Sequence, residues 1–187
     1  LDTLTMAVRA GKVRYIGGST MPAWKFAQMA ALAAAKGYAR PIAMQNLYNL
    51  IQREEEREMN RLCHEQGVGL IPYSPLARGF LAGNRSKEGG GATERAKNDA
   101  QVKAGTYRDG DWEIVKRLKK IAKGKGATPA QVALAWLLHK PYMGAPIIGA
   151  TDLDQLTSAA KSTEIALTAE ESKLLEQPYE FRVSPEN

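Results

Sequence analysis

Three short runs of apolar and β-branched residues recur along the first half of the chain, and helix-forming stretches separate them. The runs begin at residues 13, 41 and 68, about 27 residues apart, close to the minimum length of a βαβ unit. Strands that are apolar over most of their length, separated by amphipathic helices, form parallel sheets with helices packed on them. We therefore expect an α/β fold with parallel strands at residues 13–18, 41–45 and 68–73.

Residues that begin and end helices divide the chain further. Pro22 suits the first position of a helix over residues 23–36, and Gly37 suits its end. A second helix is expected at residues 53–66, with Gly67 after it. The later elements we expect are helices at residues 112–123, 129–139 and 152–161, a fourth strand at 145–149, and capping boxes at Thr128 with Gln131 and at Thr168 with Glu171.

The stretch at residues 82–111 lacks this pattern. Three successive glycines and mixed charges predict a long, mobile loop inside a single domain that spans residues 1–187. Four strands with their helices amount to half of an eightfold (β/α)8 barrel. The open edges of such a half would expose unpaired backbone, so we expect them to be covered by a missing N-terminal half or by self-association. The chain starts without Met, in what reads as the middle of a helix, which favours a fragment or a gene that has lost its front.

Composition argues against several classes of protein. The sequence has no run of 18 apolar residues and no signal peptide, so we expect no membrane partner, and the single cysteine, Cys63, favours a reducing, cytoplasmic setting. The net charge is +6, but the densest basic group falls on the helix expected at 112–123, with the spacing of a solvated face. Because no nucleic-acid reader motif accompanies it, we expect no nucleic-acid partner.

Four segments share one arrangement of strand ends. They read GKVRYIGGS at residues 11–19, MQNLYNL at 44–50, IPYSPLARG at 71–79 and PIIGAT at 146–151, with Gln155 and Leu156 after the last. Together they resemble strands five to eight of the aldo-keto reductase family, in order and spacing and over nearly the whole chain. The chain looks most similar to the bacterial, channel-β-subunit-like branch. The resemblance implies the C-terminal half of a (β/α)8 TIM barrel, with its site at the carboxyl ends of the strands.

The resemblance also implies that these strand ends bind NADP(H). Ser19 and Gln45 would bind the nicotinamide carboxamide, and the ring of Tyr73 would stack on the nicotinamide and select the transferred hydride. Each residue has a simpler interpretation: Ser19 as a helix cap, Gln45 as an amide bonded inside the barrel, and Tyr73 as a core aromatic. Thr20 stands where the family usually has Asn, and its hydroxyl is a shorter donor and acceptor than the amide of Asn.

The phosphates of the cofactor would lie farther along the chain. By resemblance, Ser74 and Leu76 contact the pyrophosphate, and Arg78 either adds charge there or is a surface arginine. Gly149 precedes a helix whose positive end faces the site, with Thr151 and Gln155 near the adenosine phosphate or adenine. Two further sets of residues bear on the adenosine end: Arg85, Arg95 and Lys97 as alternatives for the 2′-phosphate, and Ser158 and Ala159 in place of the Glu and Asn that the family often has.

The family's chemistry uses an Asp, a Tyr, a Lys and a His from the first four strands, and we expect neither a catalytic residue nor a metal in this chain. Tyr48 could line the substrate mouth, but no Lys or His accompanies it in sequence. His64 and His139 lie within helices, and Cys63 lies in mid-helix, where an inert thiol is expected. The glutamates at 54, 55, 56 and 58 read as a solvated helix start.

These expectations favour the cofactor-binding half of an NADP-dependent reductase of aldehydes and ketones. The small-molecule carbonyl substrate would be a partner of the intact enzyme, and this chain would be inactive by itself. The alternative is a non-catalytic nucleotide-binding or regulatory module derived from the same fold.

Overall fold

A parallel sheet lies at the centre of the molecule. The computed structural model describes residues 1–88, 91, 97 and 106–182. Its strands are β1 (Ile16–Ser19), β2 (Pro41–Gln45) and β3 (Gly69–Leu70), in the order β1-β2-β3. All pairings are parallel, as predicted, and β2 has the predicted bounds. β1 and β3 are shorter than expected.

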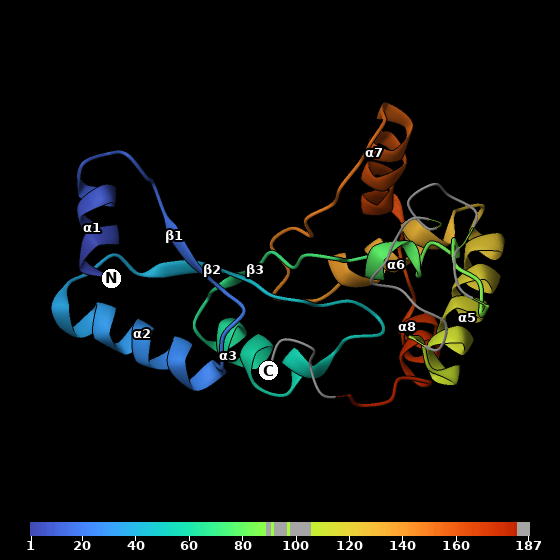
Figure 1. The fold of residues 1–187 in the computed structure, drawn as a ribbon, viewed down its shortest axis with the longest axis horizontal. Coiled ribbons are helices and arrows are strands. Elements are labelled where there is room, and N and C mark those ends of the chain that lie inside the picture. The colour runs from blue at the N-terminus through green and yellow to red at the C-terminus, as the bar shows by residue number, and fades with distance from the viewer. Residues whose placement is uncertain (89–90, 92–96, 98–105, 183–187) are drawn as a thin grey trace.

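Helices α2 (Ala23–Lys36) and α3 (Met59–Glu65) pack on one face of this sheet (Figure 1). Phe26 of α2 and Cys63 of α3 are fully buried there against Met44 and Leu70 of the strands. α2 ends at Gly37, which takes the left-handed conformation expected of a helix-terminating glycine. Helix α1 (Asp2–Arg9) lies beside this end, where the hydroxyl of Thr5 accepts the N–H of Ala39 at 2.9 Å.

A second core lies at the other end of the molecule, on the right in Figure 1. Helices α5 (Asp109–Lys125), α6 (Pro129–Leu138) and α8 (Ala169–Glu176) meet there with the short η2 turn (Ala77–Gly79). Every residue of α6 from Gln131 to Leu137 is buried, which is the pattern of a helix surrounded by protein. The capping boxes predicted at Thr128 and Thr168 begin α6 and α8.

Helix α7 (Leu153–Ala160) stands apart from both cores in Figure 1 and contains no buried residue. It leads into the η3 turn (Lys161–Glu164), which packs on α6. The Gln131 amide of α6 donates to the carbonyl of Ser158 at 2.9 Å, which links α7 to the second core. No helix among the described residues is both long and apolar enough to cross a membrane.

The fourth predicted strand, at residues 145–149, is wrong for the described chain. The preceding residues do run beside β3, because Leu70 N–H donates to Tyr142 O at 2.9 Å and Gly144 N–H donates to Leu70 O at 2.8 Å. Ile147 N–H then donates to Pro72 O at 2.8 Å. Pro146 has no N–H, and Gly144 and Ala145 both donate to Leu70 O, so the pairing is too irregular to form a strand.

Two other predicted boundaries also move. The helix expected at 53–66 breaks into η1 (Glu54–Glu56) and α3, because Glu58 has non-helical backbone angles. α5 begins at Asp109, inside the loop expected at 82–111, because the Asp111 carboxylate accepts the N–H of Arg108 and caps the helix. Residues 89–90, 92–96 and 98–105 of that loop lie outside the described residues, so its mobility stays a prediction.

Candidate cofactor-binding site

The face of the sheet turned away from α2 and α3, here called the open face, carries three of the predicted residues. Ser19 pairs with Gln45 across β1 and β2, and paired residues of parallel strands share a face. Tyr73 pairs with Leu47, two residues beyond Gln45, and therefore lies on the same face. Met44 points the other way and is buried against α2. The structure thus brings Ser19, Gln45 and Tyr73 together.

The side chains of Ser19 and Gln45 are available to a ligand. Within the described part of the chain, neither the hydroxyl of Ser19 nor the amide of Gln45 has a hydrogen-bond partner. Ser19 does not cap a helix, since α2 begins after Pro22 with no side-chain cap, so that simpler interpretation is wrong. Pro22 is the N-cap residue of α2, one position before the first helical position predicted for it. Thr20 donates its backbone N–H to Gln45 O at 3.0 Å, which extends the ladder one residue past β1.

Strands β1 and β2 lie close together at Gly17, which has no side chain. A side chain at Gly17 would lie 2.7 Å from the carbonyl oxygen of Ala43, so only glycine permits this approach of β1 to β2. Gly17, paired with Ala43, precedes Ser19 and Gln45 on the open face. The polar pair therefore lies beside an uncrowded strip of backbone.

The turn at residues 74–79 has an uncommon backbone. Ser74, Ala77 and Arg78 have φ angles of 51°, 46° and 57°, in the left-handed region that costs L-residues about 1–2 kcal/mol each. Asn49, which is fully buried, donates its amide to Ser74 O at 3.0 Å. Arg85 donates to Arg78 O at 2.7 Å. Strain of this kind is characteristic of functional sites, where the surroundings hold it.

Only some N–H groups of this turn remain for an anion. Those of Ala77, Gly79 and Phe80 donate to carbonyls within the turn. The N–H groups of Ser74 and Leu76, the two contacts expected from the sequence, have no acceptor among the described residues. The turn therefore offers two N–H groups rather than a full ring of donors.

The basic residues expected near the cofactor differ in their exposure to solvent. Arg78 is exposed, whereas Arg85 is buried and bonded to the turn, so Arg85 supports the backbone instead of facing solvent. Lys97 is exposed. Arg95 lies outside the described residues.

The adenosine end of the predicted site lies on α7. Gly149, Thr151 and Gln155 are all exposed, and the Gln155 amide donates to Thr151 Oγ1 at 3.0 Å. Asp152, which was not predicted as a site residue, caps α7 by accepting the Gln155 N–H at 2.8 Å. The start of this helix therefore carries a carboxylate, at the place where the sequence predicted that a phosphate of the cofactor would bind.

Tyr48, which by sequence could line a substrate mouth, is buried in the second core. Its ring is fully buried, and its hydroxyl donates to Glu56 Oε1 at 2.6 Å. Burial, followed by the charge of Glu56, holds the pKa of Tyr48 far above its usual value. A tyrosine in these surroundings is poorly suited to act as a general acid.

Glu56 belongs to a partly buried ionic network that the sequence did not reveal. Arg53 binds both of its carboxylate oxygens, at 3.0 and 2.8 Å, and approaches Glu176 Oε2 at 3.4 Å. Glu176 Oε1 accepts hydrogen bonds from Lys140 and Trp136, both at 2.8 Å. The solvated helix start expected at residues 54–58 is therefore wrong for Glu56. The Arg53–Glu56 spacing was the one visible signal.

The cysteine and the two histidines lie in helices or at the end of one. Cys63 is fully buried, and burial, with a smaller contribution from Glu55, raises the pKa of its thiol to about 12, so it is inert. His64 is exposed and meets the ring of Tyr142 edge-on, 6.0 Å between centroids. His139 is exposed, with Nδ1 2.6 Å from Ala135 O.

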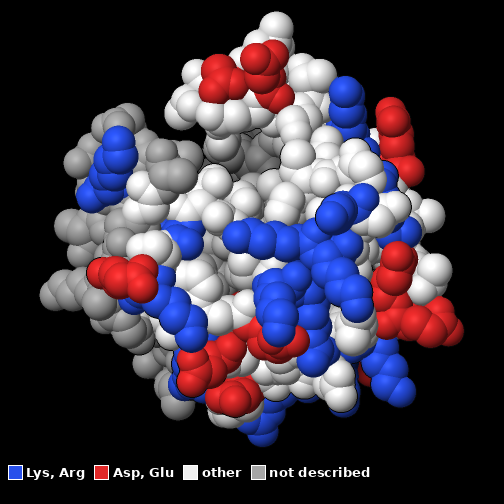
Figure 2. Space-filling view, turned by 90° about the vertical axis from the view of Figure 1, so that its right-hand side faces the viewer, with Lys and Arg blue, Asp and Glu red and all other residues white. Residues whose placement is uncertain are grey.

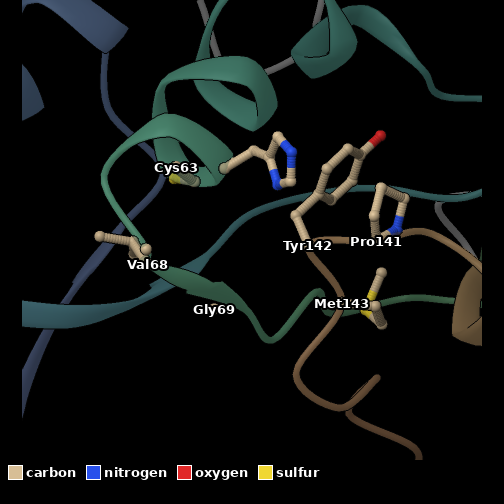
Figure 3. Close-up of a pocket in the computed structure, with 8 residues that line it drawn as sticks. Cys63, Val68, Gly69, Pro141, Tyr142 and Met143 are labelled. Carbon is tan, nitrogen blue, oxygen red and sulfur yellow. The ribbon is translucent and has the colours of Figure 1, made fainter.

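A cavity of about 260 Å³ lies elsewhere, between α3 and the segment beside β3 (Figure 3). Val68, Gly69, Tyr142 and Met143 line it, with Cys63, His64, Gly67 and Pro141. Gly69 begins β3, so this cavity lies at the amino end of the sheet, opposite Ser19, Gln45 and Tyr73. The cavity and the predicted site are distinct.

The basic residues of α5 gather on one surface. Figure 2 shows Lys and Arg side chains across the middle of the face at the α5 end of the molecule, with acidic groups around them. Lys116, Lys119, Lys120 and Lys123 are exposed, as the predicted solvated face requires. The expectation that these lysines bind no nucleic acid stays a prediction.

The chain is similar to known proteins over nearly its whole length. The versiconal hemiacetal acetate reductase of Aspergillus parasiticus is 41% identical over 182 residues, which cover 96% of this chain and 52% of that protein. A provisionally named aryl-alcohol dehydrogenase of Schizosaccharomyces pombe is 42% identical over 179 residues, covering 96% and 50%. The chain therefore spans about half the length of the curated relatives it matches. Both are fungal, so the expected bacterial, channel-like branch is not supported.

A solved structure is also similar. A thermostable aldo-keto reductase crystallised with the inhibitor epalrestat superposes with a TM-score of 0.69 at 31% identity, over 95% of this chain and 53% of that chain. Residues 1–180 match the sequence profile of the aldo/keto reductase family. With its parallel α/β sheet and strand-end residues, the chain belongs to the aldo/keto reductase family of oxidoreductases, whose fold is the TIM barrel.

Proposed function

We propose that this chain is the cofactor-binding, C-terminal half of an NADP-dependent oxidoreductase that reduces aldehydes or ketones to alcohols in the cytoplasm. The observation that carries the proposal is the pair formed by Ser19 and Gln45. Their side chains lie on neighbouring strands and one face, with no partner among the described residues. A hydroxyl and an amide so placed fit the donor and acceptor groups of a carboxamide.

The other residues of the open face fit the same ligand. When bound, the cofactor supplies a hydride to the carbonyl carbon of the substrate. Ser19 and Gln45 would hold the carboxamide and so fix the rotation of the nicotinamide ring. The half-buried ring of Tyr73 would cover one face of that ring and leave the other to the substrate.

The phosphates would bind along the neighbouring segments. The free N–H groups of Ser74 and Leu76 support a pyrophosphate contact, with Arg78 as an exposed counter-charge. Thr151 and Gln155 would meet the adenosine end at the start of α7. The Asp152 carboxylate next to them fits a ribose hydroxyl better than a 2′-phosphate. Preference for NADPH would therefore depend on Arg95 or Lys97, the other two basic residues expected from the sequence.

The proton that completes the reduction would come from outside this chain. The pKa of Tyr48 is raised by its buried surroundings, whereas a general acid needs one brought toward working pH. We therefore expect the missing N-terminal half to supply the catalytic Asp, Tyr, Lys and His. The same observation favours a second candidate, a nucleotide-binding module without catalysis, which would bind the cofactor and gain no activity from the other half.

Cofactor binding is the direct test. We expect saturable NADPH binding, followed by protein and nicotinamide fluorescence, and no carbonyl turnover by the chain alone. Gln45→Leu removes the amide and keeps the size of the side chain, so it should weaken binding about tenfold through the loss of two hydrogen bonds. Gln28→Leu, at an exposed position of α2, should leave binding unchanged. Equal affinity of Gln45→Leu and the parent chain would contradict the proposed site.

A further inference from the structure

The C-terminal segment, residues 178–182, is irregular, yet it makes contacts across more than half of the chain. The hydroxyl of Tyr179 donates to Glu54 Oε1 at 2.5 Å, and the Arg182 N–H donates to the same oxygen at 3.1 Å. The guanidinium of Arg182 forms an ion pair with Asp111, whose side chain is 2% exposed. Side-chain contacts, rather than a backbone ladder, therefore determine the path of this segment.

The segment lies directly on the first turn of α5. Asp111 accepts the Arg108 N–H through its other oxygen, so one carboxylate both caps α5 and binds Arg182. Arg108 in turn donates to Phe181 O at 3.0 Å. A side chain at Gly110 would lie 2.5 Å from Pro178 O, which shows how closely the two backbones approach.

The first turn of α5 also packs on the residue that follows the 74–79 turn. Phe80 is fully buried, and its ring stacks on Tyr107, with centroids 3.7 Å apart, and meets the edge of Trp112 at 4.8 Å. The Tyr107 hydroxyl donates to Ala77 O at 3.4 Å. A continuous set of contacts thus joins Arg182, the start of α5, Phe80 and the strained turn.

We infer that residues 178–182 position the 74–79 turn through the first turn of α5, with Arg182 as the main positioning residue. Left-handed Ser74, Ala77 and Arg78 persist only if their surroundings over-determine them. The Phe80 contacts provide that support, and the segment supports the helix end that makes them. The inference rests on the proposed function only where the turn is taken to bind the cofactor.

α8 does not depend on these contacts. Glu176 ties the end of α8 to Lys140, Trp136 and Arg53. Arg117, farther along α5, donates to Leu174 O at 2.7 Å. Loss of the Arg182 pair should therefore loosen the segment and the start of α5 without releasing α8.

Two perturbations from opposite sides of the contact test the inference. Gly110→Ala pushes on Pro178 O from α5, and Gly124→Ala is its matched control, because nothing lies within 4 Å of a side chain there. Both changes favour the helix by itself. Arg182→Gln removes the positive charge of this side chain, whereas Arg182→Lys keeps a positive charge. Hydrogen exchange is measured at residues 76–81 and 107–112, and NADPH affinity by fluorescence titration.

We expect Gly110→Ala and Arg182→Gln to speed exchange in both segments and weaken NADPH binding about fivefold. Arg182→Lys should restore much of both, and Gly124→Ala should change neither. Faster exchange confined to residues 178–182, with 76–81 unchanged, would overturn the inference. If the parent chain binds no NADPH, the proposed function fails, while the exchange result still decides whether the segment positions the turn.

Discussion

At the residue scale, Asp152 sets the charge at the start of α7. Its carboxylate accepts the Gln155 N–H at 2.8 Å, so it neutralises part of the positive helix end that a phosphate would otherwise meet. Asn caps helices as well as Asp does, so Asp152→Asn removes charge while keeping the cap. We expect NADPH binding to strengthen about threefold relative to NADH, as fluorescence titrations would measure.

Asp154→Asn is the control for this prediction. Asp154 lies in the same first turn and is exposed, but it does not cap the helix. If both variants shift the NADPH to NADH ratio equally, the effect is long-range charge and not a contact at Asp152.

Glu176 makes the free energy of unfolding depend on pH. Burial would raise the pKa of Glu176, but hydrogen bonds from Lys140 and Trp136, with the charge of Arg53, outweigh burial and lower it from its ordinary 4.5. A lowered folded pKa means that the stabilisation is present above about 4.5 and is lost as pH falls through the folded value. The free energy of unfolding should therefore decline on acidification below that pH.

We expect Glu176→Gln to lower the free energy of unfolding at pH 7 by about 2 kcal/mol and to flatten its decline in acid. Urea denaturation over a pH series measures both. Glu164→Gln, at an exposed position of η3, should leave both unchanged. An acid profile of Glu176→Gln parallel to that of the parent chain would show that other carboxylates control acid stability.

At the scale of elements, α6 is the helix on which the second core depends. Thr128 accepts the N–H of Gln131 at 3.2 Å, and Gln131 Oε1 accepts the Thr128 N–H at 2.9 Å. Thr128→Ala removes one half of this capping box and should cost about 1 kcal/mol of unfolding free energy in urea. Thr128→Ser keeps the hydroxyl and should cost much less. Equal losses would locate the effect in the methyl group of threonine.

The helices and strands differ in how well their bounds can be predicted from nearby residues. The bounds of β2, the glycine end of α2 and both capping boxes follow from chemistry within a few residues, and sequence was sufficient for them. The strand expected at 145–149 failed because pairing with β3 depends on where Gly144 and Pro146 fall along the ladder. That register is a property of two segments more than 70 residues apart.

At the scale of the whole molecule, the three-stranded sheet has an open face, and β1 forms one of its edges. Tyr15, just before the edge strand β1, is 69% exposed. Exposed strand edges pair with other chains. We expect concentration-dependent self-association in sedimentation experiments, reduced by Tyr15→Lys. Leu153→Lys, on exposed α7 away from the edge, is the control, and an equal reduction by both variants would point to general charge repulsion.

The sequence by itself determined the parallel α/β class, the family resemblance and the placement of Ser19, Gln45 and Tyr73 at strand ends. It could do so because strand and helix periods are local, and period two puts these residues on one face once the strands are parallel.

Only the tertiary structure decided that Tyr48 is buried against Glu56, that Glu176 joins Arg53 and Lys140, and that Arg182 reaches Asp111. Apart from Tyr48 and Glu56, the partners lie far apart in the chain, and Arg53 and Glu176 are separated by 123 residues. Their energies depend on burial and on distances between side chains. No local pattern encodes either quantity, because packing of the whole chain sets both.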